Sequence, residues 1–318
     1  YNQTLIDKMN ENGVYNGKVR CVEDIGYNCL ILSASDRLSA FDKYICDVPN
    51  KGLILNNISV WWFNKTKHII DNHYLYHENN HMVVKKAKPI KLEIIVRAYM
   101  TGSTNTSIWP MYNRGEREIY GINFRDNYKK NEKLDNIIIT PTTKGSTDRP
   151  ITPKEIIDLK YLSHEEWDFI SKKALELFKY GQKEASKKGL LLVDTKYEFG
   201  WLNDNIILID ELHTCDSSRY WLKDSYDDRF KLGLEPEKFD KDAIRDWVKS
   251  VCDPYKDDVP SIPSNVLKNV ENVYSEYHNI LTDYNLSKQM NLDKDLVITK
   301  YFMEYHKEIV VILAGSKK

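Results

Sequence analysis

The sequence has no excess charge of either sign and no long apolar run. Its formal net charge is −1, so no overall field draws it to nucleic acid or to an anionic membrane, and any anion-binding site must be built from locally placed cations. No apolar run approaches the roughly 20 residues that a membrane-spanning helix needs. The basic and then apolar pattern of a secretory signal is also missing at the start of the chain. We therefore expect no membrane and no nucleic acid among its partners.

Cysteine is scarce and scattered, and no CxxC pair occurs. A zinc knuckle and a disulfide framework both need closely or regularly spaced cysteines, so neither is expected. The pattern is typical of a protein of the reducing cytosol, and we expect a cytoplasmic location. The five positions are Cys21, Cys29, Cys46, Cys215 and Cys252.

The composition that is present is that of an ordinary globular protein, with 42% hydrophobic and 29% charged residues. The 318 residues are enough for two domains with separate cores. Strand patterns dominate the earlier part of the chain and helix patterns the later part. This order predicts an α+β protein of two lobes with a cleft between them. We expect a β-rich lobe at 1–96, an α+β lobe at 97–282, and a linker with a terminal strand at 283–318.

Apolar periodicity and turn residues predict the main elements of both lobes. In the earlier part we expect a hairpin at 14–34 with strands 14–22 and 29–33, a polar loop at 33–42, a helix at 54–70, strands at 82–86 and 92–99, and an irregular polar surface segment at 110–135. In the later part we expect a helix opened by the capping box of Ser163 and Glu166 and ended by Gly189, a hairpin of strands 190–193 and 206–209 around Asn203-Asp204-Asn205, and a helix ending near Leu281.

The second hairpin carries an unusual set of charges. Asp194, Lys196 and Glu198 alternate with apolar or aromatic residues, so they share one face of their strand. The turn at 203–205 folds Asp210 and Glu211 back beside them. Carboxylates this close repel one another unless a cation joins them, and Mg²⁺ prefers one or two carboxylates together with phosphate oxygens. A magnesium–nucleotide site is one interpretation, and a solvated strand face with salt bridges is the other.

Cationic segments elsewhere are equally ambiguous when each is taken alone. Gly17-Lys18-Val19-Arg20 could cover phosphates with its backbone, although a Walker A loop is absent, or it could be a plain edge strand. Arg97, which precedes Thr101-Gly102-Ser103, suits a phosphate monoester or simply caps a loop. The segments 140–144 and 216–219 leave the same two possibilities open.

Together, these segments resemble the SAICAR synthetase family. The resemblance runs in order from about residue 14 to about residue 282, and several motifs at compatible spacing are more specific than any one of them. Its segments are Gly17-Lys18-Val19-Arg20, Ser35-Asp36-Arg37-Leu38-Ser39-Ala40-Phe41-Asp42, Pro49-Asn50-Lys51-Gly52, Pro89-Ile90-Lys91-Leu92-Glu93-Ile94-Ile95-Val96-Arg97, Thr101-Gly102-Ser103, Thr140-Pro141-Thr142-Thr143-Lys144, Asp194-Thr195-Lys196-Tyr197-Glu198-Phe199-Gly200, Asp210-Glu211 and Asp216-Ser217-Ser218-Arg219-Tyr220-Trp221.

The resemblance implies an activity and a fold. ATP, L-aspartate and carboxyaminoimidazole ribonucleotide would give SAICAR, ADP and phosphate in purine biosynthesis, through an acyl phosphate. The first lobe would be an antiparallel sheet like that of protein kinases, the second would be related to ATP-grasp folds, and ATP would lie between them.

The resemblance also implies site residues. ATP would contact Gly17, Lys18, Arg20, Ala87, Glu93, Lys144, Glu198 and Asp210, with Mg²⁺ held by Glu198 and Asp210. The ribonucleotide and aspartate would contact Lys18, Ser39, Asp42, Arg97, Ser103, Asp194, Lys196, Asp216, Ser217 and Arg219. The catalytic residues would be Lys144, Asp194, Lys196 and Asp210.

Two alternatives and one departure remain. A kinase with the same first lobe is disfavoured because H-R-D and D-F-G motifs are missing, and a non-catalytic nucleotide-binding protein would not need cations for a second phosphate. The departure lies beyond residue 282, where such enzymes usually end. The segment 308–318 resembles the opening strand and phosphate loop of aminoimidazole ribonucleotide carboxylase, so we expect either a fused carboxylase domain or an ordinary terminal strand.

Overall fold

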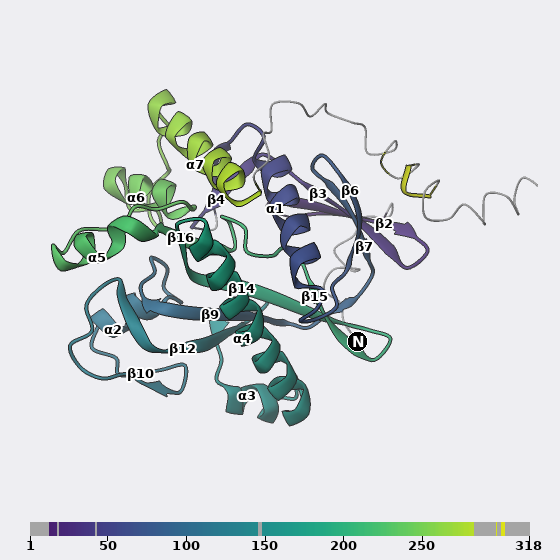
Figure 1. Cartoon of the computed structure of the whole chain (residues 1–318), viewed down its shortest axis with the longest axis horizontal. Coiled ribbons are helices and arrows are strands. Elements are labelled where there is room, and N and C mark those ends of the chain that lie inside the picture. Colours follow the sequence, from purple (N-terminus) through teal and green to yellow (C-terminus); the bar gives the residue numbers. More distant parts are fainter. Residues whose placement is uncertain are drawn as a thin grey trace, which may run out of the picture.

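Two antiparallel sheets organise the computed structural model, which describes residues 13–17, 19–41, 43–145, 148–282, 297 and 300–302 (Figure 1). The first sheet has the strand order β1-β2-β3-β7-β6. Its strands are β1 (Val14–Asn16), β2 (Arg20–Gly26), β3 (Cys29–Ala34), β6 (Tyr74–Glu78) and β7 (His81–Lys85). Each pairs with its neighbour in an antiparallel register.

The second sheet is built around one long strand, β14 (Leu190–Leu202). Its order is β13-β12-β9-β14-β15, and β16 and β8 also pair with β14. The other strands of this sheet are β8 (Lys88–Pro89), β9 (Leu92–Met100), β12 (Glu132–Thr143), β13 (Arg149–Pro150), β15 (Asn205–Ile209) and β16 (Ser218–Leu222). Because β14 meets β9, β15 and β16 along different parts of its length, its polar face is close to several segments that are distant in sequence.

Helices cover both sheets. Helix α1 (Lys51–Thr66) packs against β3, β6 and β7 on one side and against α7 (Ser264–Thr282) on the other, as Figure 1 shows. Helix α4 (His164–Lys187) lies across β14 and β9. Smaller elements complete the described residues: β4 (Arg37–Ala40), β5 (Lys43–Asp47), α2 (Ile108–Asn113), β10 (Glu118–Ile119), β11 (Ile122–Asn123), α3 (Pro153–Asp158), α5 (Lys223–Lys231) and α6 (Asp242–Val251). Across these described ranges, none of the helices combines the length and apolar character that crossing a membrane would require.

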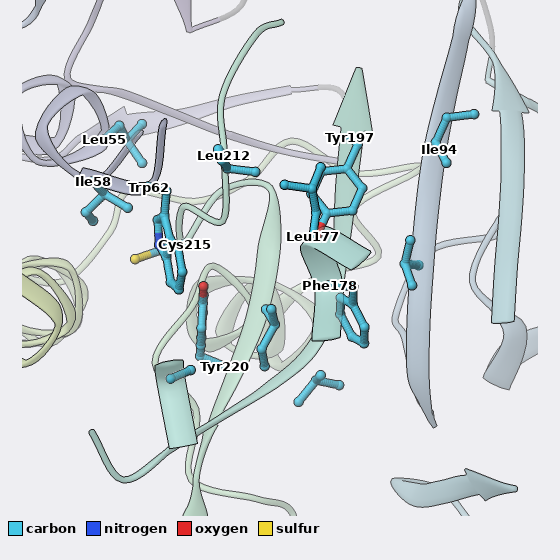
Figure 2. Close-up of a cluster of buried hydrophobic side chains, with 14 of the residues drawn as sticks. Leu55, Ile58, Trp62, Ile94, Leu177, Phe178, Tyr197, Leu212, Cys215 and Tyr220 are labelled. Carbon is cyan, nitrogen blue, oxygen red and sulfur yellow. The ribbon is translucent and has the colours of Figure 1, made fainter. Parts of the chain in front are cut away.

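A continuous apolar core joins the two sheets. Figure 2 shows how side chains from α1, β14, α4, β9, β16 and the segment after β15 converge in it. The labelled members are Leu55, Ile58, Trp62, Ile94, Leu177, Phe178, Tyr197, Leu212, Cys215 and Tyr220, and each is at most 1% exposed. This core fixes β14 against α1, so the polar face of β14 has a rigid support.

Several predicted elements are confirmed. The Ser163 side chain accepts from the Glu166 backbone, and Glu166 caps the backbone of Ser163 in return, at the start of α4. Gly189, with a φ of 77°, follows that helix, and the hairpin β14–β15 turns at Asn203 and Asp204, which both have positive φ. Helix α1 spans Lys51–Thr66, so it both begins and ends earlier than the expected 54–70, and α7 ends at Thr282.

The first hairpin needs a correction. Residues 14–22 are not one strand, because the Gly17 backbone N–H donates to the Arg20 carbonyl at 2.7 Å and a tight turn separates β1 from β2. The turn between β2 and β3 is confirmed, since Tyr27 and Asn28 have φ values of 52° and 56° there. The glycine at position 17 is what the strand pattern overlooked.

Two expected loops were also wrong. Within 33–42, β4 pairs with β5, and Leu38 and Ala40 are buried while Arg37 and Ser39 are half-buried. Buried and half-buried residues thus alternate as in a strand, but the many polar residues of the segment concealed this alternation in the sequence. Within 110–135, aromatic side chains such as Tyr112, Tyr120 and Tyr128 form a separate small core with Met100 and Ile108.

The expected linker and terminal strand at 283–318 fall almost wholly outside the described residues, so that prediction stays a prediction. Residues 96 and 97, the expected lobe boundary, both lie inside β9. We propose that the lobes instead meet at the connector before β9, where one sheet ends and the other begins.

Candidate active site

The acidic face of β14 gathers around one ammonium group. Lys196 Nζ lies 2.7 Å from Glu198 Oε1, 3.2 Å from Glu93 Oε1 and 3.6 Å from Asp210 Oδ2. Period two places Lys196 and Glu198 on the same face, while Glu93 comes from β9 and Asp210 follows β15. Burial would lower the pKa of Lys196, but Glu198, Glu93 and Asp210 raise it well above its usual value. The lysine is therefore charged and holds the carboxylates together.

Further cations complete this cluster. Lys144 donates to the other oxygen of Glu198, whose side chain is 4% exposed. Arg20, from the first sheet, contacts Asp210 at 2.5 Å and Glu211 at 2.8 Å. Burial would raise the pKa of Asp210, but Arg20, followed by Lys196 and Lys144, holds it well below its usual range. Asp210 is therefore ionised at neutral pH.

The backbone of Asp210 is itself unusual. Its φ is 69°, the left-handed region that residues other than glycine rarely adopt, at a cost of order 1–3 kcal/mol. This backbone conformation directs the carboxylate of Asp210 toward the ammonium of Lys196 and the guanidinium of Arg20. The surrounding ion pairs hold the strained residue in place.

The carboxylate pair of Glu198 and Asp210 fits one oxygen-ligated divalent ion that also binds phosphate. Within the described ranges, no three Asp, Glu, His or Cys side chains converge closely enough to hold a metal ion alone. Mg²⁺ needs only one or two carboxylates when phosphate oxygens supply the rest. The ammonium of Lys196 occupies the point between the two carboxylates and stands in for such a cation.

A polar cavity of about 180 Å³ opens beside this cluster, and Lys196 and Glu93 belong to both. Its other lining residues are Ile95, Arg97, Thr104, Thr106, Ser107, Thr142, Asp148, Asp194, Thr195, Asp216, Ser217, Ser218, Arg219 and Arg245.

Two arginines face one aspartate in this cavity because of strand register. Asp194 on β14 is paired with Arg97 on β9 and with Arg219 on β16. Arg219 contacts Asp194 at 2.8 Å, and Arg97 contacts it at 3.6 Å. Arg97 also donates to Thr140 Oγ1 at 2.8 Å. The two guanidinium groups form one wall of the cavity, and Asp194 together with Asp242, 2.6 Å from Arg219, offsets their charge. Guanidinium groups side by side are suited to bind an anion.

The loop after β9 adds hydroxyl groups to that wall. Gly102 has a φ of 121°, and a Cβ built there would lie 2.2 Å from the Ser107 Cβ, so only glycine fits. This close approach brings Thr104, Thr106 and Ser107 to the cavity next to Arg97. Hydroxyl donors beside arginines suit a phosphate monoester.

A buried ion pair anchors the side of the cavity that is lined by residues 216–219. Lys51, at the start of α1, donates to Asp216 Oδ2 at 2.8 Å, and the Tyr274 hydroxyl on α7 donates to the other oxygen of Asp216. Lys51 is fully buried. This pair ties α1 and α7 to the segment that carries Ser217 and Arg219.

The structure brings most of the predicted site residues together. The charge cluster and the cavity include Arg20, Glu93, Arg97, Lys144, Asp194, Lys196, Glu198, Asp210, Asp216, Ser217 and Arg219. Gly17 forms the turn before β2, Ala87 lies in the connector next to Gly200, and Ser39 is in β4. Ser103 approaches Asp242 at 3.4 Å and is not among the cavity-lining residues. Lys18 and Asp42 lie outside the described residues.

Sequence reasoning missed one group of site residues. Arg245 lines the cavity from α6, and Asp242 on the same helix forms an ion pair with Arg219, with Oδ2 2.6 Å from Nε. The charged run Asp240-Lys241-Asp242 with Arg245 one turn later is visible in the sequence. It carried no signal by itself, because such a run on a helix is usually a solvated face.

Comparisons with known proteins give a consistent result. The family model described as SAICAR synthetase matches residues 13–262. A phosphoribosylaminoimidazole-succinocarboxamide synthase of Legionella pneumophila (strain Paris) is 46% identical over 272 residues, which are 84% of this chain and 87% of that protein. The chloroplastic synthase of the same name from Arabidopsis thaliana is 49% identical over 255 residues, 79% of this chain and 62% of that one. The structure of a SAICAR synthase from Saccharomyces cerevisiae complexed with SAICAR matches with a TM-score of 0.75 and 28% identity, and covers 89% of this chain and 100% of that chain.

Proposed function

Because the chain belongs to the SAICAR synthetase family, we infer that it catalyses the reaction of that family. It is an ADP-forming carbon–nitrogen ligase of purine biosynthesis. ATP drives the joining of L-aspartate to carboxyaminoimidazole ribonucleotide, and the products are SAICAR, ADP and phosphate. The alternative of a kinase finds no support in the comparisons.

One observation in this chain carries the proposal. The ammonium of Lys196 lies among three carboxylates at one end of a cavity whose other wall presents Arg97 and Arg219. The first arrangement suits a metal–nucleotide complex and the second suits a phosphorylated partner. A ligase that joins two substrates at the expense of ATP needs both sites next to each other.

We propose that nucleotide and metal bind at the charge cluster. Glu198 and Asp210 would hold Mg²⁺, with Arg20 and Lys144 beside the phosphates. When bound, the ion would offset charge on the transferring phosphoryl group. The first sheet would form a kinase-like lobe over the nucleotide, and the second sheet with its helices an ATP-grasp-like lobe. The strand order and the position of Arg20 between the sheets support this division.

The proposed chemistry has two steps. A carboxylate oxygen of the ribonucleotide attacks the γ-phosphorus of ATP, the bond to the ADP oxygen breaks, and an acyl phosphate forms. The aspartate amine then attacks the carbonyl carbon, loses a proton, and phosphate leaves with the bonding electrons. Lys144 and Lys196 offset the charge that develops in the first step. Asp194 orients Arg97 and Arg219 on the ribonucleotide phosphate.

A coupled assay tests this function. ADP release should require both L-aspartate and carboxyaminoimidazole ribonucleotide. Turnover of ATP with the ribonucleotide alone, at the full rate, would contradict the ligase assignment. We also propose a cytoplasmic location, which the five free cysteines support.

A further inference from the structure

Helix α6 presents an arginine to the cavity whose hydrogen-bonding capacity is only partly used. Arg245 Nη1 donates to Asp242 Oδ1 at 2.8 Å. Its Nε is buried and finds no hydrogen-bond partner among the described residues. A guanidinium has five N–H donors. A buried donor without an acceptor is costly, so an acceptor supplied by a ligand is expected here.

Lys241, four residues earlier at the N-cap of α6, is a second largely buried cation, next to the cavity-lining Asp216. Its side chain is 11% exposed, and its ammonium lies 3.9 Å from Asp216 Oδ2, too far for a hydrogen bond. That carboxylate is already held by Lys51 and by the hydroxyl of Tyr274. Burial, with Arg245 and Lys51 near and in spite of Asp216, lowers the pKa of Lys241 to about 8. An anion beside it would be strongly favoured.

Arg245 and Lys241 are paired with different carboxylates from Arg97, the arginine proposed to bind the phosphate. Arg97 contacts Asp194 at 3.6 Å. Arg245 contacts Asp242 at 2.8 Å, and Lys241 lies 3.9 Å from Asp216. The Arg219–Asp242 pair stands between the two groups, because Asp242 contacts both Arg219 and Arg245. The cavity thus has a second anion-binding side.

We propose that Arg245 and Lys241 bind the two carboxylates of the amino-acid substrate, which is a dicarboxylate. This assignment rests on the proposed function. The backbone N–H of Arg245 donates to the carbonyl of Lys241, the N-cap residue, at 3.3 Å, so the two residues are one helical turn apart and the two cations can act on one small molecule. The planar guanidinium matches a carboxylate with two parallel hydrogen bonds, and the ammonium supplies a compact charge.

The arrangement also accounts for selection of the substrate. Asp216 and Asp242 would repel a dicarboxylate if their charge were not offset by these cations. A neutral amide or methyl in place of one carboxylate leaves a buried cation unpaired. Sites built in this way reject the wrong ligand strongly. L-Asparagine and L-alanine should therefore be poor substrates.

The test compares Arg245→Gln and Lys241→Gln with the wild-type protein. We expect the KM for L-aspartate to rise about tenfold or more in each variant, and the KM values for ATP and the ribonucleotide to change less than about twofold. Succinate, a dicarboxylate without the amine, is titrated calorimetrically onto the intact protein. Its affinity should fall by a similar factor in both variants.

Two further variants keep the test decisive. Arg245→Lys retains the charge and should recover part of the aspartate affinity. It replaces Arg245→Gln in the comparison if circular dichroism shows that Arg245→Gln folds poorly. Arg114→Gln is the matched control, since Arg114 pairs with Glu116 at the surface and is 54% exposed. It should change no KM.

The proposal is overturned if folded Arg245 variants keep the wild-type aspartate KM and succinate affinity. It is equally overturned if the KM for the ribonucleotide rises and that for aspartate does not, because Arg245 would then belong to the phosphate wall. A wild-type protein that releases no ADP with all three substrates would contradict the proposed function instead. The succinate titration would still decide the role of α6.

Discussion

At the scale of single residues, Asp210 combines a strained backbone with ion pairs to both Arg20 and Lys196. Asp210→Asn removes one oxygen ligand and one charge from the proposed magnesium site. We expect kcat to fall about 100-fold or more at saturating Mg²⁺, with little change in the KM for the ribonucleotide. Asp204→Asn, in the exposed turn of the same hairpin, is the control. Full turnover of Asp210→Asn would refute the role given to this carboxylate.

Arg97 is predicted to act mainly in binding. Arg97→Ala removes one of the two guanidinium groups that face Asp194, while Arg219 remains to keep that carboxylate paired. The KM for the ribonucleotide should rise about 10- to 100-fold, since charge-assisted hydrogen bonds to phosphate are lost. Steady-state kinetics with varied ribonucleotide measure this, with Arg117→Ala at the surface as control. An unchanged ribonucleotide KM would show that Arg97 has only a structural role.

His213 gives the fold a pH dependence that is separate from catalysis. Its Nε2 lies 2.6 Å from the Tyr197 hydroxyl, and burial lowers its pKa to about 3. Between the ordinary pKa of about 6.5 and that value, the unfolded chain binds a proton that the folded chain does not. The stability contributed by this group is therefore complete above pH 6.5 and declines as the pH falls.

We expect the wild-type free energy of unfolding to lose about 2 kcal/mol through His213 between pH 7 and pH 5. His213→Gln, although less stable at pH 7, should lose less over the same range. Urea unfolding of both proteins at the two pH values gives the comparison. Equal losses in both proteins would mean that folding does not lower the pKa of His213.

At the scale of elements, the capping box of α4 is a local feature with a local cost. Ser163→Ala removes the acceptor for the Glu166 backbone N–H and should lower the free energy of unfolding by about 1 kcal/mol. Because Ser163 is exposed and distant from the cavity lining, kcat should not change. Lys172→Ala, at an exposed position within the same helix, is the control for urea unfolding. A loss of activity in Ser163→Ala would contradict a purely local role and would mean that the start of α4 helps to position β14.

Elements with a strong local signal were predictable, and elements defined by tertiary context were not. The β14–β15 hairpin has alternation and a turn of Asn203 and Asp204, and α4 has its cap, so both were found. The long strand β12 was missed because residues 132–135 are polar and Pro141 interrupts the pattern. Its place in the sheet comes from pairing with β9, for example Ile138 with Arg97. A pattern read over a few neighbouring residues cannot reveal a partner so far away in the sequence.

The candidate site divides in the same way. The carboxylates on β14 follow from period two, but their partners do not. Glu93 and Lys144 reach Glu198 and Lys196 only through sheet pairing, and Arg20 arrives from the other sheet. Family resemblance supplied these residues where spacing could not. Neither route pointed to Arg245, which tertiary packing of α6 brings to the cavity.

At the scale of the whole molecule, Arg20 links the first sheet to the carboxylates of the second. Arg20→Gln leaves Asp210 and Glu211 with less neutralising charge, and the free energy of unfolding should fall by about 2 kcal/mol. Mg²⁺ should stabilise this variant more than the wild type, because the ion can replace the missing charge. Thermal unfolding with and without Mg²⁺ measures both effects. Lys86→Gln breaks the pair with Asp24 inside the first sheet and serves as control; an equal response of both variants to Mg²⁺ would contradict the link.

The register of β14 limits how this molecule can change over evolutionary time. Side chains at 194, 196 and 198 point to one side, and three neighbouring strands read that side from different edges. A point substitution removes the contacts of one side chain, whereas gaining or losing a single residue between 194 and 198 would turn the later side chains of the strand to the opposite face and separate its charges from every partner at once. Related sequences should therefore keep the length of this strand as well as its charged residues.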